Sequence, residues 1–219
     1  MLKRLVVQIL GRERANRIAG PFHDWKASQR TQKMLGALPQ KNLLINIGCG
    51  PKSLRGWINL DSARGDEIDV VWDLRRGLPF PNESATAIFG EHVIEHVPRP
   101  DAESLLQECR RVLQTGGVLR LSTPDAGKFL RSYAGDQKFL ADERFVDPAD
   151  TPMDRVNMMM REFGQHLWVY DAQSLIHLLQ NVGFSSVEER AFGVSAHQSM
   201  QGIDAAEREF ESLYVEAVK

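Results

Sequence analysis

The stretch that decides the fold runs from residue 43 to residue 61 and reads "LLINIGCGPKSLRGWINLD". Its first five residues are apolar enough for a buried strand, which Gly48 and Gly50 then end abruptly. A second apolar run at 57–60 closes on Asp61. Two strands joined through glycines, with an acid after the second, are typical of sites that hold nucleotide-like cofactors.

The connection between these two strands is unusually short. Only residues 51–56 separate the glycines from the second apolar run. A crossover between parallel strands normally needs about a dozen residues, so the first helix is a turn at most. The alternative is a tight turn within a core, and the acid that closes the second strand favours a trimmed cofactor site instead.

Short apolar runs alternate with helical segments along the rest of the chain. Two segments have helical character: 101–113, which is amphipathic, and 171–182, which Asp171 and Gly183 bracket as cap residues. This alternation predicts an α/β fold, a doubly wound and mostly parallel sheet of about seven strands. The expected strands are 43–47, 57–60, 69–72, 86–90, 118–121, 186–190 and 212–218.

The length of 219 residues suits a single domain, 1–219, and we divide it into four parts. Residues 1–41 are expected to form N-terminal helices, and 42–125 the cofactor-binding core. Residues 126–170, rich in charge and methionine, are expected to form a helical insert or lid. Residues 171–219 supply the C-terminal helix and strands.

Composition excludes several classes of function. Lys and Arg number 27 against 29 Asp and Glu, so no basic surface for nucleic acid is expected. Two cysteines are too few for a disulfide scaffold, which favours a reduced, cytoplasmic protein. The N-terminal "MLKRLVVQILGRER" is too short to span a bilayer. We expect a helix packed on the domain there, with weak peripheral membrane contact as the alternative.

Polar residues and glycines gather where the expected strands end. The carboxyl ends of parallel strands meet at one edge of a sheet, where ligands bind. Gly48 and Gly50 would let the backbone approach a ligand closely, and Asp61 would accept hydrogen bonds from ribose hydroxyls. Asp73 is expected to bind an adenine amino group, with Leu74 packed beside the ring.

Several of these segments resemble the class I S-adenosylmethionine-dependent methyltransferases, in particular the small type-11-like family. The matching segments are "NIGCG", "INLD", "DVVWDL", "EHVIEHV", "LLQECRRVLQTGGVLRLSTPD" and "ESLYVEAVK". The resemblance covers residues 41–125 well and the terminal strands more loosely, and it implies an antiparallel last strand. It also implies S-adenosyl-L-methionine as the cofactor, held by Gly48, Cys49, Gly50, Asp61, Asp73, Leu74 and, at its amino-acid end, Glu91.

The sequence departs from the family pattern at three positions. Asn46 replaces an acid that often precedes the first glycine, Lys52 replaces a frequent third glycine, and Thr86 replaces a further acid. Asn46 can still hold the loop by hydrogen bonds. Lys52 lacks the backbone freedom of glycine, so the loop is expected to follow a different path.

Histidines dominate the expected acceptor side. His92 and His96 follow the fourth strand and are the candidates for the catalytic groups, because histidine suits the role of a base near neutral pH. His166 in "FGQHLWVYD", with Trp168 and Tyr170, either shapes an acceptor pocket or packs in the core. The acceptor is expected to be a small or glycan-like molecule, and methylation at oxygen is one option.

Parts of the sequence suggest three other functions. The segment from His92 to His96 matches the H-x-x-E-H pattern of zinc proteases, but Pro98 and Pro100 leave no room for the long helix that pattern requires, and no metal site is expected. A nicotinamide-dependent oxidoreductase would need G-x-G-x-x-G opening a full helix, and Leu54 stands at the third glycine's place. A catalytically degenerate methyltransferase fold that serves as a binding protein is the remaining alternative.

Overall fold

The computed structural model describes residues 21–147 and 149–219, which fall into two compact units. The first unit ends at Leu38 and contains helix α3, Pro21–Ala37. The second unit is Pro39–Lys219 and holds every feature discussed below. The basic N-terminal stretch lies outside the described residues. No helix among the described residues is long and apolar enough to cross a bilayer.

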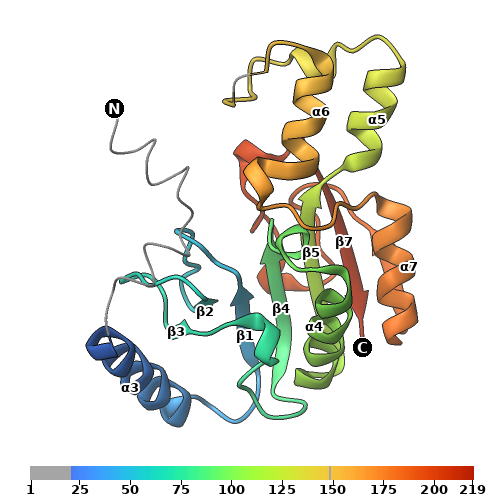
Figure 1. The fold of residues 1–219 in the computed structure, drawn as a ribbon. Helices are drawn as coiled ribbons and strands as arrows, with labels where there is room; N and C mark the ends of the chain where they lie inside the picture. The colour runs from blue at the N-terminus through green and yellow to red at the C-terminus, as the bar shows by residue number, and fades with distance from the viewer. Residues whose placement is uncertain (1–20, 148) are drawn as a thin grey trace. The chain divides into compact units, whose positions relative to one another are not determined.

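A single seven-stranded sheet organises the second unit, in the order β3-β2-β1-β4-β5-β7-β6 (Figure 1). Strands β1 to β5 pair in parallel, whereas β7 runs antiparallel to both β5 and β6. The expectation of a mostly parallel sheet with an antiparallel last strand is therefore confirmed. The strands are β1 Leu43–Ile47, β2 Ile58–Asp61, β3 Val70–Val71, β4 Ala85–Glu91, β5 Leu113–Pro124, β6 Ser186–Glu189 and β7 Ser212–Val218.

The fifth strand is much longer than the sequence pattern predicts. Helix α4, Arg99–Val112, ends one residue earlier than predicted, and β5 then runs through Gly116 and Gly117, which precede the predicted start of this strand at residue 118. The reason is a pairing with the last residue of the chain. Gly116 donates its N–H to the Lys219 carbonyl at 3.0 Å, and Gly117 accepts from the Lys219 N–H at 3.0 Å.

The first crossover contains only turns, as the short linker predicts. The Asn46 amide holds this loop by donating to the Lys52 carbonyl at 3.1 Å and to the Asn59 side-chain oxygen at 3.0 Å. The Asn59 oxygen in turn accepts from Leu54 N at 2.7 Å. Two buried amides therefore fix the path between β1 and β2 where a helix is usually found.

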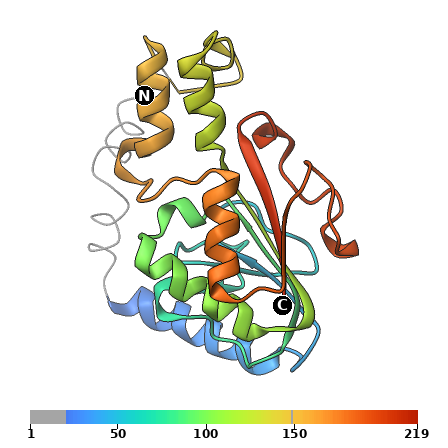
Figure 2. The same ribbon diagram turned by 90° about the vertical axis from the view of Figure 1, so that its right-hand side faces the viewer.

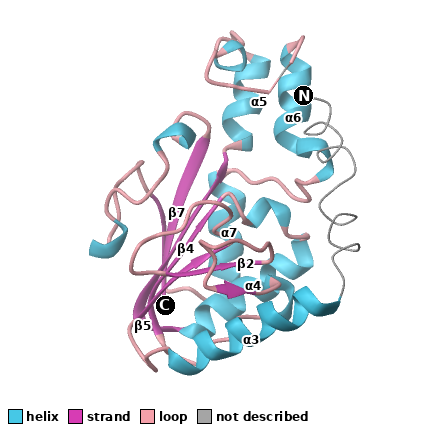
Figure 3. Cartoon of the chain, turned by 90° about the vertical axis from the view of Figure 1, so that its left-hand side faces the viewer, coloured by secondary structure: helices cyan, strands magenta, loops and turns pink. Residues whose placement is uncertain are grey.

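The two faces of the sheet are covered differently. Helices α4 and α7, Ala172–Val182, pack against each other and against the strands at the β5–β6 end of the sheet. The segment 191–211 lies on the opposite face (Figure 2 and Figure 3), where Met200 and Ile203 pack against Ala87 and Val118. The predicted caps of α7 are present, because Asp171 accepts from Ser174 N and Gly183 is left-handed at φ 99°.

The expected insert consists of two helices, α5 Ala126–Ala134 and α6 Pro152–Arg161, which pack side by side beyond the carboxyl ends of the strands (Figure 1). Phe129, Phe139 and Phe145 form an aromatic cluster within it. Phe210 of the segment 191–211 joins that cluster, with its ring centroid 4.8 Å from that of Phe145. The insert and the C-terminal segment thus share one core.

A buried ion network fixes the segment 191–211 to the sheet. Arg120 on β5 is fully buried and binds the Asp204 carboxylate through two nitrogens, at 2.8 and 2.5 Å. It also donates to Glu216 on β7 at 3.0 Å and to the Val194 carbonyl at 2.8 Å. Because each charge has its partner in place, this network sets where residues 204–211 lie over the strand ends.

Candidate active site

A cavity of about 240 Å³ opens at the carboxyl ends of β1 and β4. It lies where the sheet order reverses, the place at which open α/β sheets bind ligands. Four of the predicted cofactor residues, Gly48, Cys49, Gly50 and Glu91, line it together with His92. The remaining lining residues are Asn46, Pro51, Lys52, Leu54, Phe89, Ile203, Ala205 and Arg208.

The two glycines of the loop serve different purposes. Gly48 has φ 60°, and a Cβ built on it would lie 2.3 Å from the Val93 side chain, so packing excludes any larger residue. Gly50 has φ 51° and nothing within 4 Å of such a Cβ, so open space adjoins it. The Gly50 N–H donates to Asp61 at 2.8 Å, and the same carboxylate accepts from Ala63 N at 2.7 Å.

The remaining predicted cofactor residues, Asp61, Asp73 and Leu74, are not among the residues that line this cavity. Asp61 is connected to the cavity wall by the hydrogen bond that it accepts from the Gly50 N–H. Asp73 caps the short helix η1, Leu74–Arg76, and its ion pair with Arg75 lowers the pKa of the carboxyl below its ordinary value. Burial raises the pKa of the Cys49 thiol to about 12, so the side chain is a neutral thiol and not a reactive thiolate at pH 7.

Lys52 lines the cavity and forms ion pairs with two acidic side chains. Its ammonium lies 3.7 Å from the Glu91 carboxylate and also contacts the Glu207 carboxylate. Glu91 accepts a second interaction, from the Ala205 N–H at 2.8 Å. A cation and an anion therefore stand next to each other at the end of the fourth strand, where the sequence predicted only the anion.

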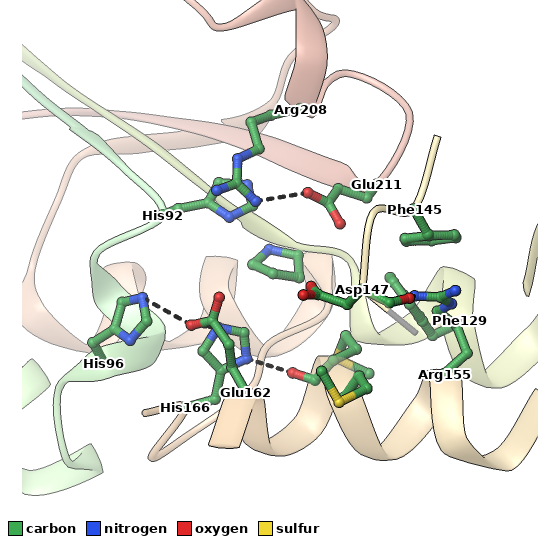
Figure 4. Close-up of a pocket in the computed structure, with 13 residues that line it drawn as sticks. His92, His96, Phe129, Phe145, Asp147, Arg155, Glu162, His166, Arg208 and Glu211 are labelled. Atoms are coloured by element: carbon green, nitrogen blue, oxygen red, sulfur yellow. Dashed lines mark hydrogen bonds and ion pairs between the residues drawn. The ribbon is translucent and has the colours of Figure 1, made fainter. Parts of the chain in front are cut away.

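A second cavity, of about 110 Å³, lies between the strand ends and the insert (Figure 4). Its wall combines aromatic and methionine side chains with an unusual number of charges. Both predicted catalytic histidines, His92 and His96, line it, as does His166. The other lining residues are Pro124, Phe129, Phe145, Asp147, Arg155, Met158, Met159, Glu162, Arg208 and Glu211.

His92 lines both cavities. Its backbone is left-handed at φ 49°, a conformation that residues other than glycine adopt mainly where the surroundings impose it. Its Nε2 lies 2.7 Å from the Ser212 hydroxyl, and its Nδ1 lies 3.4 Å from the Glu95 carboxylate. Burial lowers the pKa of His92 well below its ordinary value, so the ring is neutral at pH 7.

His96 and His166 come together across the second cavity, with ring centroids 4.9 Å apart. His96 does not share a helical face with His92, because only Ile94–His96 is helical and that as a single short turn, η2. The neighbours of His166 in sequence take other positions. Tyr170 is buried outside the cavity wall, and the Trp168 side chain is half exposed.

Arg208 is a residue of the candidate site that local sequence patterns miss. It lines both cavities, as His92 does, and pairs with Glu211 at 2.9 Å (Figure 4). Nothing in its own segment marks it, because the segment 191–211 has no recognisable motif. Its position depends on the burial of Asp204 against Arg120, a contact between residues 84 positions apart.

A family model described as a methyltransferase domain matches residues 22–189, which is most of the chain. The chain belongs to the methyltransferase family. The protein is an S-adenosylmethionine-dependent enzyme of that family, as the resemblance of its sequence segments implied. None of the curated proteins matches the methyltransferase in a sequence search.

Solved structures resemble the methyltransferase at low identity. An S-adenosylmethionine-dependent methyltransferase from Archaeoglobus fulgidus is 12% identical, with 90% of this chain and 94% of that chain covered and a TM-score of 0.49. A possible histamine N-methyltransferase from Thermotoga maritima is 19% identical, with 88% and 89% covered and a TM-score of 0.49. An S-adenosylmethionine-dependent methyltransferase from Mesorhizobium loti is 16% identical, with 86% of this chain and 96% of that chain covered and a TM-score of 0.47. At these identities the likeness concerns the fold.

Proposed function

We propose that this methyltransferase transfers a methyl group to a hydroxyl oxygen of a small, polar, glycan-like acceptor. The observation that carries the proposal is that His92 lines both cavities. The cavity at the glycine loop would hold the cofactor, and the cavity under the insert would hold the acceptor. Methyl transfer is an in-line displacement that requires the two molecules to meet, and His92 stands where they would.

The first cavity fits the cofactor in shape and charge. The open space beside Gly50 leaves room for a ligand against the backbone. Glu91 and Lys52 offer opposite charges for the ammonium and the carboxylate of the methionine end. Asp61 keeps acceptor capacity for ribose hydroxyls, because a carboxylate offers about four lone-pair sites and two are used by Gly50 and Ala63. Asp73 and Leu74 would border the adenine.

The second cavity suits a polar acceptor with a compact apolar part. Arg155, Arg208, Asp147 and Glu162 supply charged groups for hydrogen bonds with hydroxyls, while the aromatic and methionine side chains supply apolar walls. Sugars combine hydroxyl edges with weakly apolar faces, so this mixture supports a glycan-like acceptor. The insert closes over the cavity and would exclude water from the reaction.

Only a few side chains of the protein would take part in the methyl transfer. The cofactor supplies a methyl group on a sulfonium sulfur. His92, neutral at pH 7, would accept the proton of the acceptor hydroxyl while that oxygen bonds to the methyl carbon. The carbon–sulfur bond breaks and its electron pair stays on sulfur. Ser212, at 2.7 Å from the other ring nitrogen, would orient the imidazole.

Calorimetry with S-adenosylhomocysteine tests the cofactor half of the proposal. Wild-type protein is expected to bind it in the micromolar range, and Asp61→Asn at least tenfold more weakly, because the Gly50 amide and the ribose lose a charged acceptor. Asp136→Asn, on an exposed carboxylate of the insert, is the matched control and should bind like wild type. Equal affinities for all three proteins would contradict the assignment of Asp61.

Measurements of enzymatic turnover test the part of the proposal that concerns the acceptor. A panel of monosaccharides and other small polyols is screened for loss of the methyl donor. His92→Asn is expected to reduce turnover of any acceptor found by about 10²–10⁴-fold, with S-adenosylhomocysteine affinity within about threefold of wild type. An acceptor methylated at nitrogen or carbon would overturn the oxygen assignment. Cofactor binding with no turnover on any acceptor class would favour the degenerate binding protein.

A further inference from the structure

A cluster of imidazoles and carboxylates borders the second cavity, and the methyl transfer described above uses only Glu162 of it, as a charged group for the acceptor hydroxyls. The members are Glu95, His96, Glu162 and His166. One ligand atom from each of Glu95, His96 and His166 lies within 4.8 Å of the other two. We propose that this cluster binds a divalent first-row transition metal, which would hold the acceptor hydroxyl. That role rests on the proposed function, whereas metal binding itself does not.

Both histidines are arranged as metal-binding histidines usually are. His96 Nδ1 lies 3.1 Å from the Gln165 carbonyl, and His166 Nδ1 contacts the Met159 carbonyl. A ring that donates Nδ1–H to a backbone carbonyl presents the lone pair of Nε2 to the other side. Both Nε2 atoms point to the same carboxylate, that of Glu162, at 3.8 and 3.2 Å.

The hydrogen bonds of the two histidines do not explain why the Glu95 carboxylate is buried beside them. Its side chain is 0% exposed, and neither carboxylate oxygen accepts a hydrogen bond from any residue that the structure describes. Nδ1 of the neutral His92 ring lies 3.4 Å from this carboxylate. A buried carboxylate that accepts no hydrogen bond is unfavourable unless it is protonated or meets a cation. A bound metal would satisfy it.

The backbone holds the two halves of the cluster in place. Leu167 and Trp168 both donate their N–H groups to the Glu95 carbonyl, at 2.8 and 3.2 Å. The segment that carries Glu162 and His166 is therefore tied to the turn that carries Glu95 and His96. Glu162 is itself left-handed at φ 35°, which turns its carboxylate away from the helix that precedes it. These constraints bring the ligands together without the metal.

The donor set favours particular metals. Two imidazole nitrogens with two carboxylates suit Zn²⁺, Co²⁺, Fe²⁺ or Mn²⁺, whereas Mg²⁺ prefers oxygen ligands alone. Metal bonds of about 2.1 Å put neighbouring ligand atoms about 3.0–3.4 Å apart. The ligand atoms of Glu95, His96 and His166, which lie within 4.8 Å of one another, would therefore have to draw closer on binding. Coordination positions facing the cavity would remain open to a hydroxyl oxygen, which a metal polarises.

Titration of the full chain, freed of metal with a chelator, tests the proposal. Calorimetry with Zn²⁺ and Mn²⁺ is expected to show one site of micromolar or tighter affinity, and Co²⁺ should give the visible absorption bands of a low-symmetry nitrogen–oxygen site. The variant His96→Ala/His166→Ala should bind at least 100-fold more weakly and lose those bands. His177→Ala, an exposed histidine on α7, is the matched control.

Two further measurements keep the outcome clear. Glu95→Gln keeps the shape of the side chain. A loss of metal affinity in this variant therefore cannot be attributed to unfolding, as it could be in the double histidine variant. Metal binding that survives in both variants, or none by wild type, overturns the proposal. S-adenosylhomocysteine binding is measured on the same samples. If it persists while metal binding is absent, the metal site fails and the proposed function stands.

Discussion

His96 and His166, which are 70 positions apart in the chain, direct their Nε2 atoms at one carboxylate, that of Glu162, and fix their Nδ1 atoms on backbone carbonyls. Each histidine is thereby held in one orientation by groups that do not titrate near neutral pH. The arrangement lies beside His92, which lines both cavities. Groups from the sheet and from the insert thus meet at one point.

The two glycines of the loop should respond differently to the same substitution. Gly48→Ala places a methyl group against Val93 and is expected to destabilise the protein by about 2–4 kcal/mol, from overpacking and a left-handed alanine. Gly50→Ala meets open space and should cost about 1–2 kcal/mol, mostly from backbone strain. It should, however, weaken S-adenosylhomocysteine binding tenfold or more.

Urea unfolding and calorimetry on both glycine variants separate these effects. A Gly50→Ala variant that binds S-adenosylhomocysteine like wild type would show that the ligand does not approach the loop at this residue.

Lys52 is expected to assist cofactor binding rather than obstruct it. Lys52→Ala should weaken S-adenosylhomocysteine binding about tenfold, or about 1.4 kcal/mol, because the ligand carboxylate loses its cation. Glu207→Ala removes a competing partner of Lys52 and should leave the affinity equal or slightly higher. Lys138→Ala, an exposed lysine in the insert, is the control. Tighter binding by Lys52→Ala would mean that the lysine occupies the ligand's place.

The buried network at Arg120 should be needed for the fold. Arg120→Met leaves Asp204 buried without its cation and Glu216 with Arg190 alone, and it is expected to cost about 3–5 kcal/mol in the free energy of unfolding. Adding Asp204→Asn and Glu216→Gln to it removes the stranded charges and should recover much of that loss. Arg161→Met, on an exposed arginine of α6, should change stability by less than about 0.5 kcal/mol.

Urea unfolding of these arginine variants measures the difference. An Arg120→Met protein as stable as the triple variant would mean that the two acids are not held as charges.

Glu108 gives an expectation for pH. Its hydrogen bond and ion pair with Arg111 lower the pKa of the carboxyl below its ordinary value of 4.5, and it also accepts from Leu78 N at 2.9 Å. A lowered pKa means that the carboxylate stabilises the fold above that ordinary value. The contribution is lost as the pH falls through the lowered pKa. Glu108→Gln should therefore cost about 1 kcal/mol at pH 7 and much less in acid.

Urea unfolding of Glu108→Gln at several pH values checks this expectation. Glu103→Gln, in the exposed pair with Arg99 on the same helix, is the control and should show little dependence on pH. A Glu108→Gln deficit that stays constant from neutral to acidic pH would contradict the role assigned to the charge.

The cofactor half of the site could be predicted because its signals are local. Gly48, Gly50, Asp61 and Glu91 stand at the ends of strands whose apolar runs are visible in the sequence, and parallel strands bring their carboxyl ends to one edge. The short crossover predicted the missing helix, and Asn46 does hold the loop. The glycines that continue β5 were misread, because their pairing with Lys219 is distant in sequence.

What the amino-acid sequence determined by itself is the α/β architecture, the glycine loop and the row of acids, since period, turn chemistry and strand ends are properties of neighbouring residues. What only the tertiary structure decided is the acceptor side. The pattern from His92 to His96 offered no third ligand nearby, and folding brings Glu162 and His166 to it from the insert. Arg208 arrives because Arg120 buries Asp204. Such long-range packing leaves no periodic trace in the chain.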